Sequence, residues 1–195
     1  MNGGRSAPEM TRVVVAIDPA VTSGEEADET GIVIAGEDNK GHGYVLADIS
    51  GRYPPTQWAR LAINAYTTHG ADRIVAEVNN RGDMVEAMLR MVDPNVAFTA
   101  VHASRGKVVR AEPVAALYEQ GRDHHIGTFP QLEDQMTSFT SDIDRAAAGY
   151  SPDCVDALVW AFSELLVEPM KGGNIYELNG TASPWGAAAS PEGRW

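Results

Sequence analysis

Four acidic residues of this chain are placed where carboxylates could act together. Asp18 ends a β-branched run at 12–17, and Glu77 lies within a second apolar run. Asp153 and Asp156 open the most apolar helical pattern in the sequence, and their i, i+3 spacing places both side chains on one helical face. Hard cations such as Mg²⁺ and Mn²⁺ prefer oxygen ligands, and two such ions can clamp the attacking and leaving oxygens of a phosphodiester. We therefore expect these acids to form a catalytic site for two Mg²⁺ or Mn²⁺ ions.

Two of the four acids also have a purely structural explanation. Asp18 precedes Pro19 and could start a turn, and Asp153 could complement the positive end of a helix dipole. Glu77 and Asp156 have apolar neighbours, where a carboxylate is costly unless it is paired or bound to a cation. The four acids together therefore favour a functional site more strongly than any one of them alone.

Basic and amide side chains near the acids are candidates for binding a substrate. Arg105, Lys107 and Arg110 follow a predicted strand and open a predicted helix, where cations and backbone N–H groups could both meet phosphate. Asn80 follows Glu77 closely and could face the substrate. The alternatives are a solvated helix start and an ordinary Asn-rich turn.

The histidines and the single cysteine offer no competing metal site in the sequence. The five histidines lack the spacing of a ligand set, and His124 and His125 are predicted to be a surface pair. Cys154 lies between two acids in sequence but points to another side of the helix, so we expect it to pack in the core. A lone cysteine forms no internal disulfide and is typical of a reducing compartment.

The spacing of apolar residues predicts the elements that would bring the acids together. Strands are expected at 12–17, 31–35, 44–49, 71–78 and 96–101, and helices at 54–69, 83–92, 107–120, 132–139 and 151–168. The first three strands form a meander, so the chain is of the α/β class with a mixed central sheet flanked by helices. Ligands gather at the strand ends along one edge of such a sheet.

Two of these helices carry more specific expectations. Ser151 is predicted to be the N-cap of the last helix. The helix at 83–92 is predicted to bury an apolar stripe made of Met84, Ala87, Met88 and Met91.

Length and composition indicate a single globular domain. A chain of 195 residues suits one domain, expected at 12–168, with a disordered lead-in at 1–11 and a flexible tail at 169–195. The sequence contains no apolar run of about 18 residues, so we expect no membrane association and a cytoplasmic location.

The formal net charge of −12 bears on any interaction with nucleic acid. A protein that binds DNA alone usually presents a basic surface, because neutralising phosphates supplies much of the affinity. We therefore expect weak DNA affinity, with metal ions, local basic patches or another domain holding the DNA.

Four segments carry a resemblance to a known family: VVVAIDP ending at Pro19, DETGI from Asp28, VAEVNN around Glu77, and DCVDALVWA from Asp153. Together they resemble the nuclease domain of large terminases from tailed phages and gene transfer agents, over roughly residues 12–168. The resemblance implies an RNase H/RuvC-like fold. It also implies a two-metal endonuclease that cuts concatemeric double-stranded DNA during genome packaging into a capsid, in a bacterial host cell.

The same resemblance assigns roles and partners. It implies that Asp18, Glu77 and Asp156 are the core metal ligands, and that Asp153 is an additional ligand or base. It further implies a packaging ATPase domain, a portal and a small terminase as partners. The phosphate-binding motif G-x-x-x-x-G-K-[ST] of the ATPase is absent from the sequence, so we expect the ATPase to lie outside this chain.

Two other functions remain open from the sequence. A RuvC-like Holliday junction resolvase would share the fold and the carboxylates. A non-catalytic assembly module of a packaging motor would use the acids as a regulatory cation site. Metal-dependent cleavage and preference for four-way junctions distinguish the three possibilities.

Overall fold

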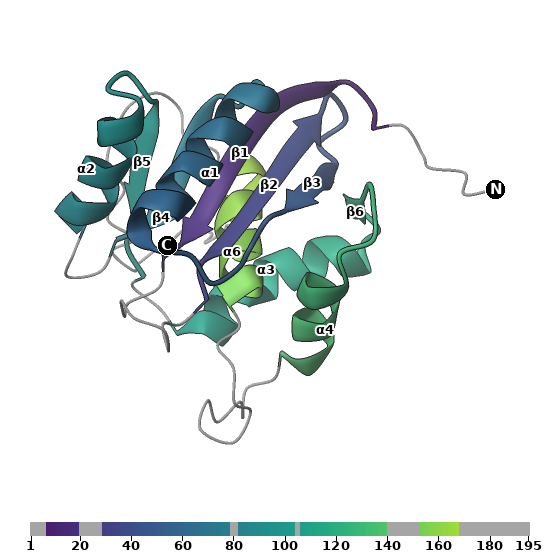
Figure 1. The fold of residues 1–195 in the computed structure, drawn as a ribbon. Helices are drawn as coiled ribbons and strands as arrows, with labels where there is room; N and C mark the ends of the chain where they lie inside the picture. Colours follow the sequence, from purple (N-terminus) through teal and green to yellow (C-terminus); the bar gives the residue numbers. More distant parts are fainter. Residues whose placement is uncertain (1–6, 20–28, 79–81, 104–105, 140–152, 168–195) are drawn as a thin grey trace, which may run out of the picture.

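A mixed six-stranded sheet runs through the centre of the molecule (Figure 1). The computed structural model describes residues 7–19, 29–78, 82–103, 106–139 and 153–167. The strand order is β5-β4-β1-β2-β3-β6, formed by β1 (Met10–Asp18), β2 (Gly31–Asp38), β3 (Gly43–Asp48), β4 (Arg73–Glu77), β5 (Phe98–Val101) and β6 (Asp123–His125). The helices are α1 (Pro55–Thr68), α2 (Gly82–Val92), α3 (Lys107–Glu119), α4 (Pro130–Ser138) and α6 (Asp153–Phe162), which continues into a π-helical turn, η1 (Ser163–Val167).

Strand β1 lies at the middle of the sheet and aligns the acids. It pairs antiparallel with β2, where Asp18 faces Gly31, and parallel with β4, where Ile17 faces Ala76. Asp18 and Glu77 are the next residues along these two parallel strands, so they end neighbouring strands at the same edge. The predicted alignment of the two acids is confirmed.

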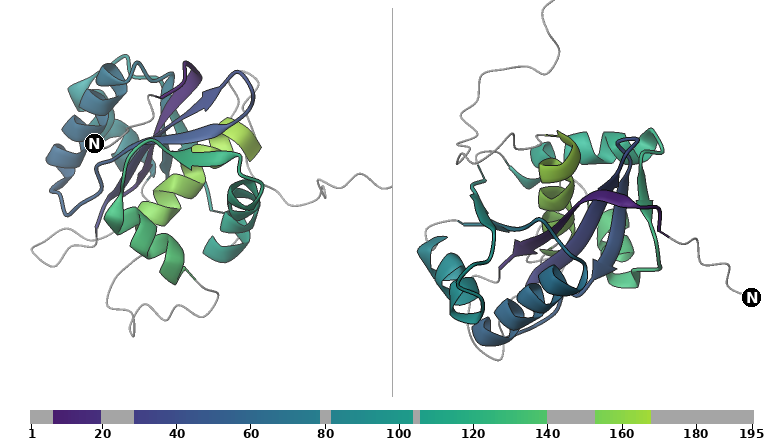
Figure 2. Two further views of the ribbon diagram at one scale, coloured as in Figure 1. Left: turned by 90° about the vertical axis from the view of Figure 1, so that its right-hand side faces the viewer. Right: turned by 90° about the horizontal axis from the view of Figure 1, so that it is seen from above.

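The sheet divides the core into two layers (Figure 2). Because side chains alternate along a strand, Val15 and Ile17 of β1 pack toward α1 and α2, whereas Val14 and Ala16 pack toward α6. Helices α3 and α4 lie on the same side as α6 and contact it. A strand buried on both faces explains why residues 13–17 are continuously apolar.

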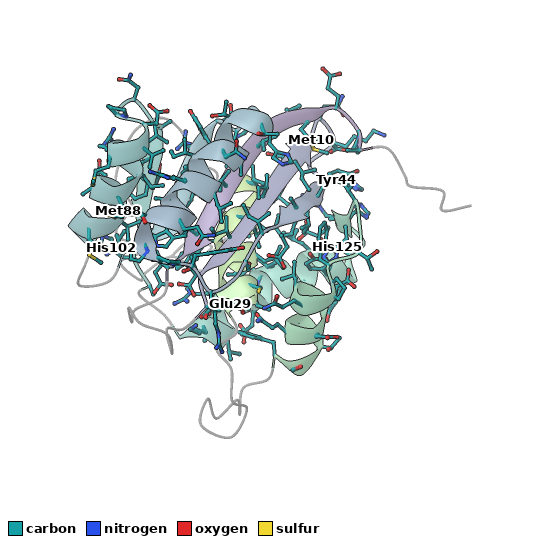
Figure 3. All side chains as sticks on the ribbon, viewed as in Figure 1. Met10, Glu29, Tyr44, Met88, His102 and His125 are labelled. Carbon is teal, nitrogen blue, oxygen red and sulfur yellow. The ribbon has the colours of Figure 1, made fainter. Side chains whose placement is uncertain are left out.

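Helix α2 is turned differently from the predicted orientation. Val85 and Leu89 are its buried residues, whereas Met84 and Met91 are 49% and 77% exposed. Met88, labelled in Figure 3, is only partly buried. Apolar residues occur on more than one side of this helix, so spacing alone did not identify the face that packs on α1.

Strand β6 was not predicted, and its histidines are not a simple surface pair. Its three residues have little strand character, but they pair in parallel with Gly43–Val45 of β3. His124 Nε2 lies 3.0 Å from Nδ1 of His42, and His125 Nε2 lies 2.8 Å from the hydroxyl of Tyr118. Both histidines are half-buried. The strand was missed because tertiary pairing rather than local sequence forms it.

The predicted element boundaries are otherwise close. Strand β1 starts at Met10, two residues before the expected domain start at 12, and the last helix gives way to a π-helical turn at Ser163. The tail at 169–195 and the proposed N-cap Ser151 lie outside the described residues. Within the described part of the chain, no helix is long and apolar enough to cross a membrane.

Asp123 is a buried acid on β6, the outermost strand beside β3. It is 5% exposed, and Gly43 opposite it leaves room for the carboxyl group beside Phe162. Burial raises the pKa of Asp123 to about 7, although the nearby charge of Arg122 lowers it. The folded protein therefore holds a proton that the unfolded chain releases near pH 4.

This proton predicts a pH-dependent effect of Asp123→Asn on stability. Because the folded-state pKa is raised, the wild-type protein loses stability as pH rises from about 4 to about 7. The amide carries no such charge, so the variant should be more stable than wild type at pH 8 by roughly 1 to 3 kcal/mol, and similar to it at pH 4. Urea unfolding at both pH values measures this, with the exposed Asp134→Asn as control. A constant difference at both pH values would contradict the assignment.

Candidate active site

Three carboxylates converge beside the end of β1. Ligand oxygens of Asp18, Asp153 and Asp156 all lie within 4.8 Å of one another. Asp18 ends the central strand, and the other two occupy the first turn of α6, where they are 6% and 2% exposed. Within the described part of the chain, these three acids form the one group of potential ligands that could hold a metal ion.

The close approach of α6 to β2 brings this cluster together. A Cβ atom at Gly31 would collide with the backbone carbonyl of Asp153, so glycine permits the first turn of α6 to lie against the strand. Gly31 also faces Asp18 across the β1–β2 ladder. The short spacing among the three acids therefore depends on a residue that carries no side chain.

A buried glutamine on α4 caps the helix that carries two of the acids. Oε1 of Gln135 accepts hydrogen bonds from the backbone N–H groups of Cys154 at 3.1 Å and Val155 at 3.4 Å. These are N–H groups of the first helical turn, which have no acceptor within the helix itself. Gln135 was not predicted from the sequence, because a capping group from another helix leaves no local signal.

Crowding and burial shift the acids toward their neutral forms. The pKa of Asp18 is raised well above its ordinary value by burial and then by the charge of Asp156, while Lys107 opposes the shift. Burial also raises the pKa of Asp156, against the charges of Lys107 and Arg110. A cation between these groups would stabilise their ionised forms.

Lys107 and Arg110 of α3 reach the acids directly. Nζ of Lys107 forms an ion pair with Oδ2 of Asp156. Nη2 of Arg110 lies 3.4 Å from Oδ1 of Asp156 and 3.5 Å from Oε2 of Glu77. The structure thus brings two of the predicted basic residues to the predicted acids, and each cation partly neutralises the buried negative charge.

Glu77 lies next to the group of three acids and is held by a tryptophan. Its Oε2 accepts a hydrogen bond of 3.0 Å from Nε1 of Trp160, and Arg110 links it to Asp156. Trp160 lies in the segment from Asp153 that resembles large terminases, but no role was predicted for it. Its position four residues after Asp156, on the same helical side, was the available signal.

Two of the predicted substrate-binding residues, Asn80 and Arg105, lie outside the described residues. Glu29, labelled in Figure 3, lies just before β2 and accepts a hydrogen bond from the side-chain amide of Gln131 on α4.

Cys154 is buried, as predicted for a core residue, and burial raises the pKa of its thiol to about 12. Such a thiol is a packing group rather than a nucleophile.

A mixed sheet with acids at the ends of two parallel central strands and at the start of the final helix defines an RNase H-like domain. The chain belongs to the terminase RNaseH-like domain family, whose model matches residues 15–165. The predicted α/β class and the resemblance to large terminases are thereby confirmed.

Solved structures of low sequence identity share the fold. The large terminase nuclease from thermophilic phage G20c has a TM-score of 0.57 at 18% identity, covering 78% of this chain and 82% of that chain. The nuclease domain of the large terminase subunit of bacterial virus Sf6 has a TM-score of 0.58 at 17% identity, covering 79% and 89%. The human cytomegalovirus terminase nuclease domain has a TM-score of 0.56 at 13% identity, covering 77% and 82%. No curated protein matches the chain.

Removing the Gln135 cap should loosen the helix that carries Asp153 and Asp156. Gln135→Leu leaves the first-turn N–H groups without their acceptor in a buried place, so we expect a loss of about 1 to 2 kcal/mol in unfolding free energy. Urea unfolding measures the loss. The matched control is Gln131→Leu, an exposed glutamine on the same helix, which should change stability by less than about 0.5 kcal/mol. Equal effects of the two substitutions would argue against the cap.

Proposed function

We propose that this domain is a divalent-metal-dependent endonuclease that cuts concatemeric double-stranded DNA during packaging of a genome into a capsid. The observation that carries the proposal is the convergence of Asp18, Asp153 and Asp156 at the end of the central strand of a terminase RNase H-like domain.

The chemistry of the three acids fits a hard divalent cation. All three offer carboxylate oxygen, the ligand type that Mg²⁺ and Mn²⁺ prefer. Burial and the charge of neighbouring acids disfavour the ionised forms of Asp18 and Asp156, and a cation would relieve both effects. Related nucleases support the same choice of metal, since that of phage G20c has been crystallised with magnesium and that of human cytomegalovirus was soaked with manganese.

We assign Asp18, Glu77 and Asp156 as the core ligands of two ions, with Asp153 as an additional ligand or the group that positions water. When bound, the ions would supply an activated water and stabilise the departing 3′ oxygen. Glu77 lies beside the other acids and is linked to Asp156 through Arg110.

The basic residues of α3 have two tasks in this proposal. In the absence of a metal, Lys107 and Arg110 offset the charge of the acids with which they pair. With DNA present, the same cations offset phosphate charge, together with Arg105 and with Asn80 as a polar contact. Lys107 and Arg110 lie near the start of α3, beside the acids rather than on a remote surface.

The acidic character of the chain bears on its partners. A net charge of −12 gives little electrostatic attraction to DNA, so a partner must present the duplex. A packaging ATPase domain is the partner that we propose for this task, with a portal and a small terminase in the complete machine. We propose that this machine works in the cytoplasm of a bacterial host. The family match favours this function over a junction resolvase.

Asp18→Asn tests the nuclease directly. The amide keeps the shape of the side chain but removes the central negative charge, so conversion of supercoiled plasmid in Mn²⁺ or Mg²⁺ should fall at least about 100-fold, with the fold retained. EDTA should abolish cutting by the wild-type protein. Asp48→Asn is the matched control, because Asp48 ends β3 outside the group of three acids.

Three outcomes separate the alternatives. Cutting that persists in EDTA or in Asp18→Asn would contradict the metal nuclease. Strong preference for a four-way junction over duplex DNA would favour a resolvase. A folded protein that binds metal and cuts no DNA, at high protein concentration and low salt and with a packaging ATPase domain supplied, would favour the non-catalytic assembly module.

Lys107→Met tests whether the lysine competes with metal for Asp156. Without the ammonium group, a divalent ion no longer displaces a partner from this carboxylate, so Mn²⁺ affinity without DNA should rise several-fold, by roughly 3- to 10-fold. Plasmid cutting should fall, because a phosphate contact is lost. Calorimetric titration and the plasmid assay measure the two effects. Weaker Mn²⁺ binding by the variant would instead show that the lysine supports the metal site.

A further inference from the structure

Trp160 connects the helix of the acidic cluster to the one acid that comes from β4. It lies one helical turn after Asp156, on the same side of α6, and is 3% exposed. Its indole N–H donates a 3.0 Å hydrogen bond to Oε2 of Glu77. A buried indole N–H needs an acceptor, and here the acceptor is a carboxylate, which makes the bond a strong one.

The same indole ring holds the cation that faces these acids. The guanidinium carbon of Arg110 lies 4.8 Å from the centre of the Trp160 ring, within the range of a cation–π interaction. Arg110 is 8% exposed in its side chain and lies between Glu77 and Asp156. Trp160 therefore contacts both a proposed ligand and the group that neutralises it.

Glu77 needs such a contact more than the other acids do. It is the glutamate among the four proposed ligands, and its side chain has one more rotatable bond than an aspartate. A metal ligand must hold its oxygen at a fixed place, and ligand orientation is commonly set by a hydrogen bond from a neighbouring group. The indole N–H fixes one oxygen of Glu77 and thereby the direction of the other.

We propose that Trp160 is a positioning residue that orients Glu77 for metal binding. The proposal rests on the proposed function, because it assumes that Glu77 is a metal ligand. Trp160 itself touches neither metal nor DNA in this role. It acts through the indole N–H on Glu77, so the effect of removing the N–H depends on the presence of the carboxylate.

Trp160→Phe removes the N–H donor and keeps an aromatic ring. Calorimetric titration with Mn²⁺ alone should show binding weakened about 10- to 100-fold, the usual effect of losing a partner of a metal ligand. The matched control is Trp58→Phe, the same substitution at a buried tryptophan in the opposite core layer, which should leave Mn²⁺ affinity unchanged. Thermal unfolding of each variant checks that it is folded.

A double-mutant cycle separates positioning from a structural effect. If Trp160 acts through Glu77, then Trp160→Phe should weaken Mn²⁺ binding by less than about 2-fold in a Glu77→Gln background. Equal losses in both backgrounds, or no loss in the wild-type background, would overturn the role of Trp160.

A measurement on the wild-type protein keeps the proposal testable if Trp160→Phe does not fold. The indole N–H resonance of Trp160, assigned by NMR, should shift on titration with Mg²⁺, while that of Trp58 stays in place. A Trp160 resonance that does not move as Mg²⁺ binds would overturn the proposal. Failure of the wild-type protein to bind either ion would overturn the metal-dependent nuclease as well, which distinguishes the two failures.

Discussion

Burying like charges next to one another costs free energy, and Asp18, Asp153 and Asp156 incur this cost at one edge of the sheet. Helix α3 partly offsets it with Lys107 and Arg110, each paired with Asp156. The pKa values of Asp18 and Asp156 nevertheless remain raised by burial. A domain that kept these acids only for stability would be better served by apolar residues, and this cost supports the cation site that we propose.

The surrounding fold serves mainly to hold this cluster in place. Parallel pairing of β1 with β4 brings Asp18 and Glu77 to neighbouring strand ends, and Gly31 lets α6 approach the sheet. Gln135 and Trp160 then fix the helix start and the glutamate from outside the cluster. Five elements that are distant in sequence, β1, β2, β4, α4 and α6, therefore meet at one place. The geometry of the site depends on these buried tertiary contacts.

Sequence reasoning recovered the parts of the fold that depend on local pattern. The apolar run before Asp18 and the helical pattern after Asp153 were sufficient to place the two main elements of the site. It failed where a distant residue decides the outcome. Strand β6 forms only because β3 offers an edge, and Gln135 caps a helix that begins 18 residues later. The pairing of Lys107 with Asp156 was equally invisible, because the sequence showed a basic helix start without showing what it faces.

The most direct test of the account is an anomalous-diffraction experiment on crystals soaked in Mn²⁺. The account predicts strong manganese peaks among Asp18, Asp153 and Asp156, one of them within reach of Glu77, with the ammonium group of Lys107 moved away from Asp156. Saturating Mn²⁺ with no peak at this place, and with Lys107 still paired to Asp156, would contradict the account.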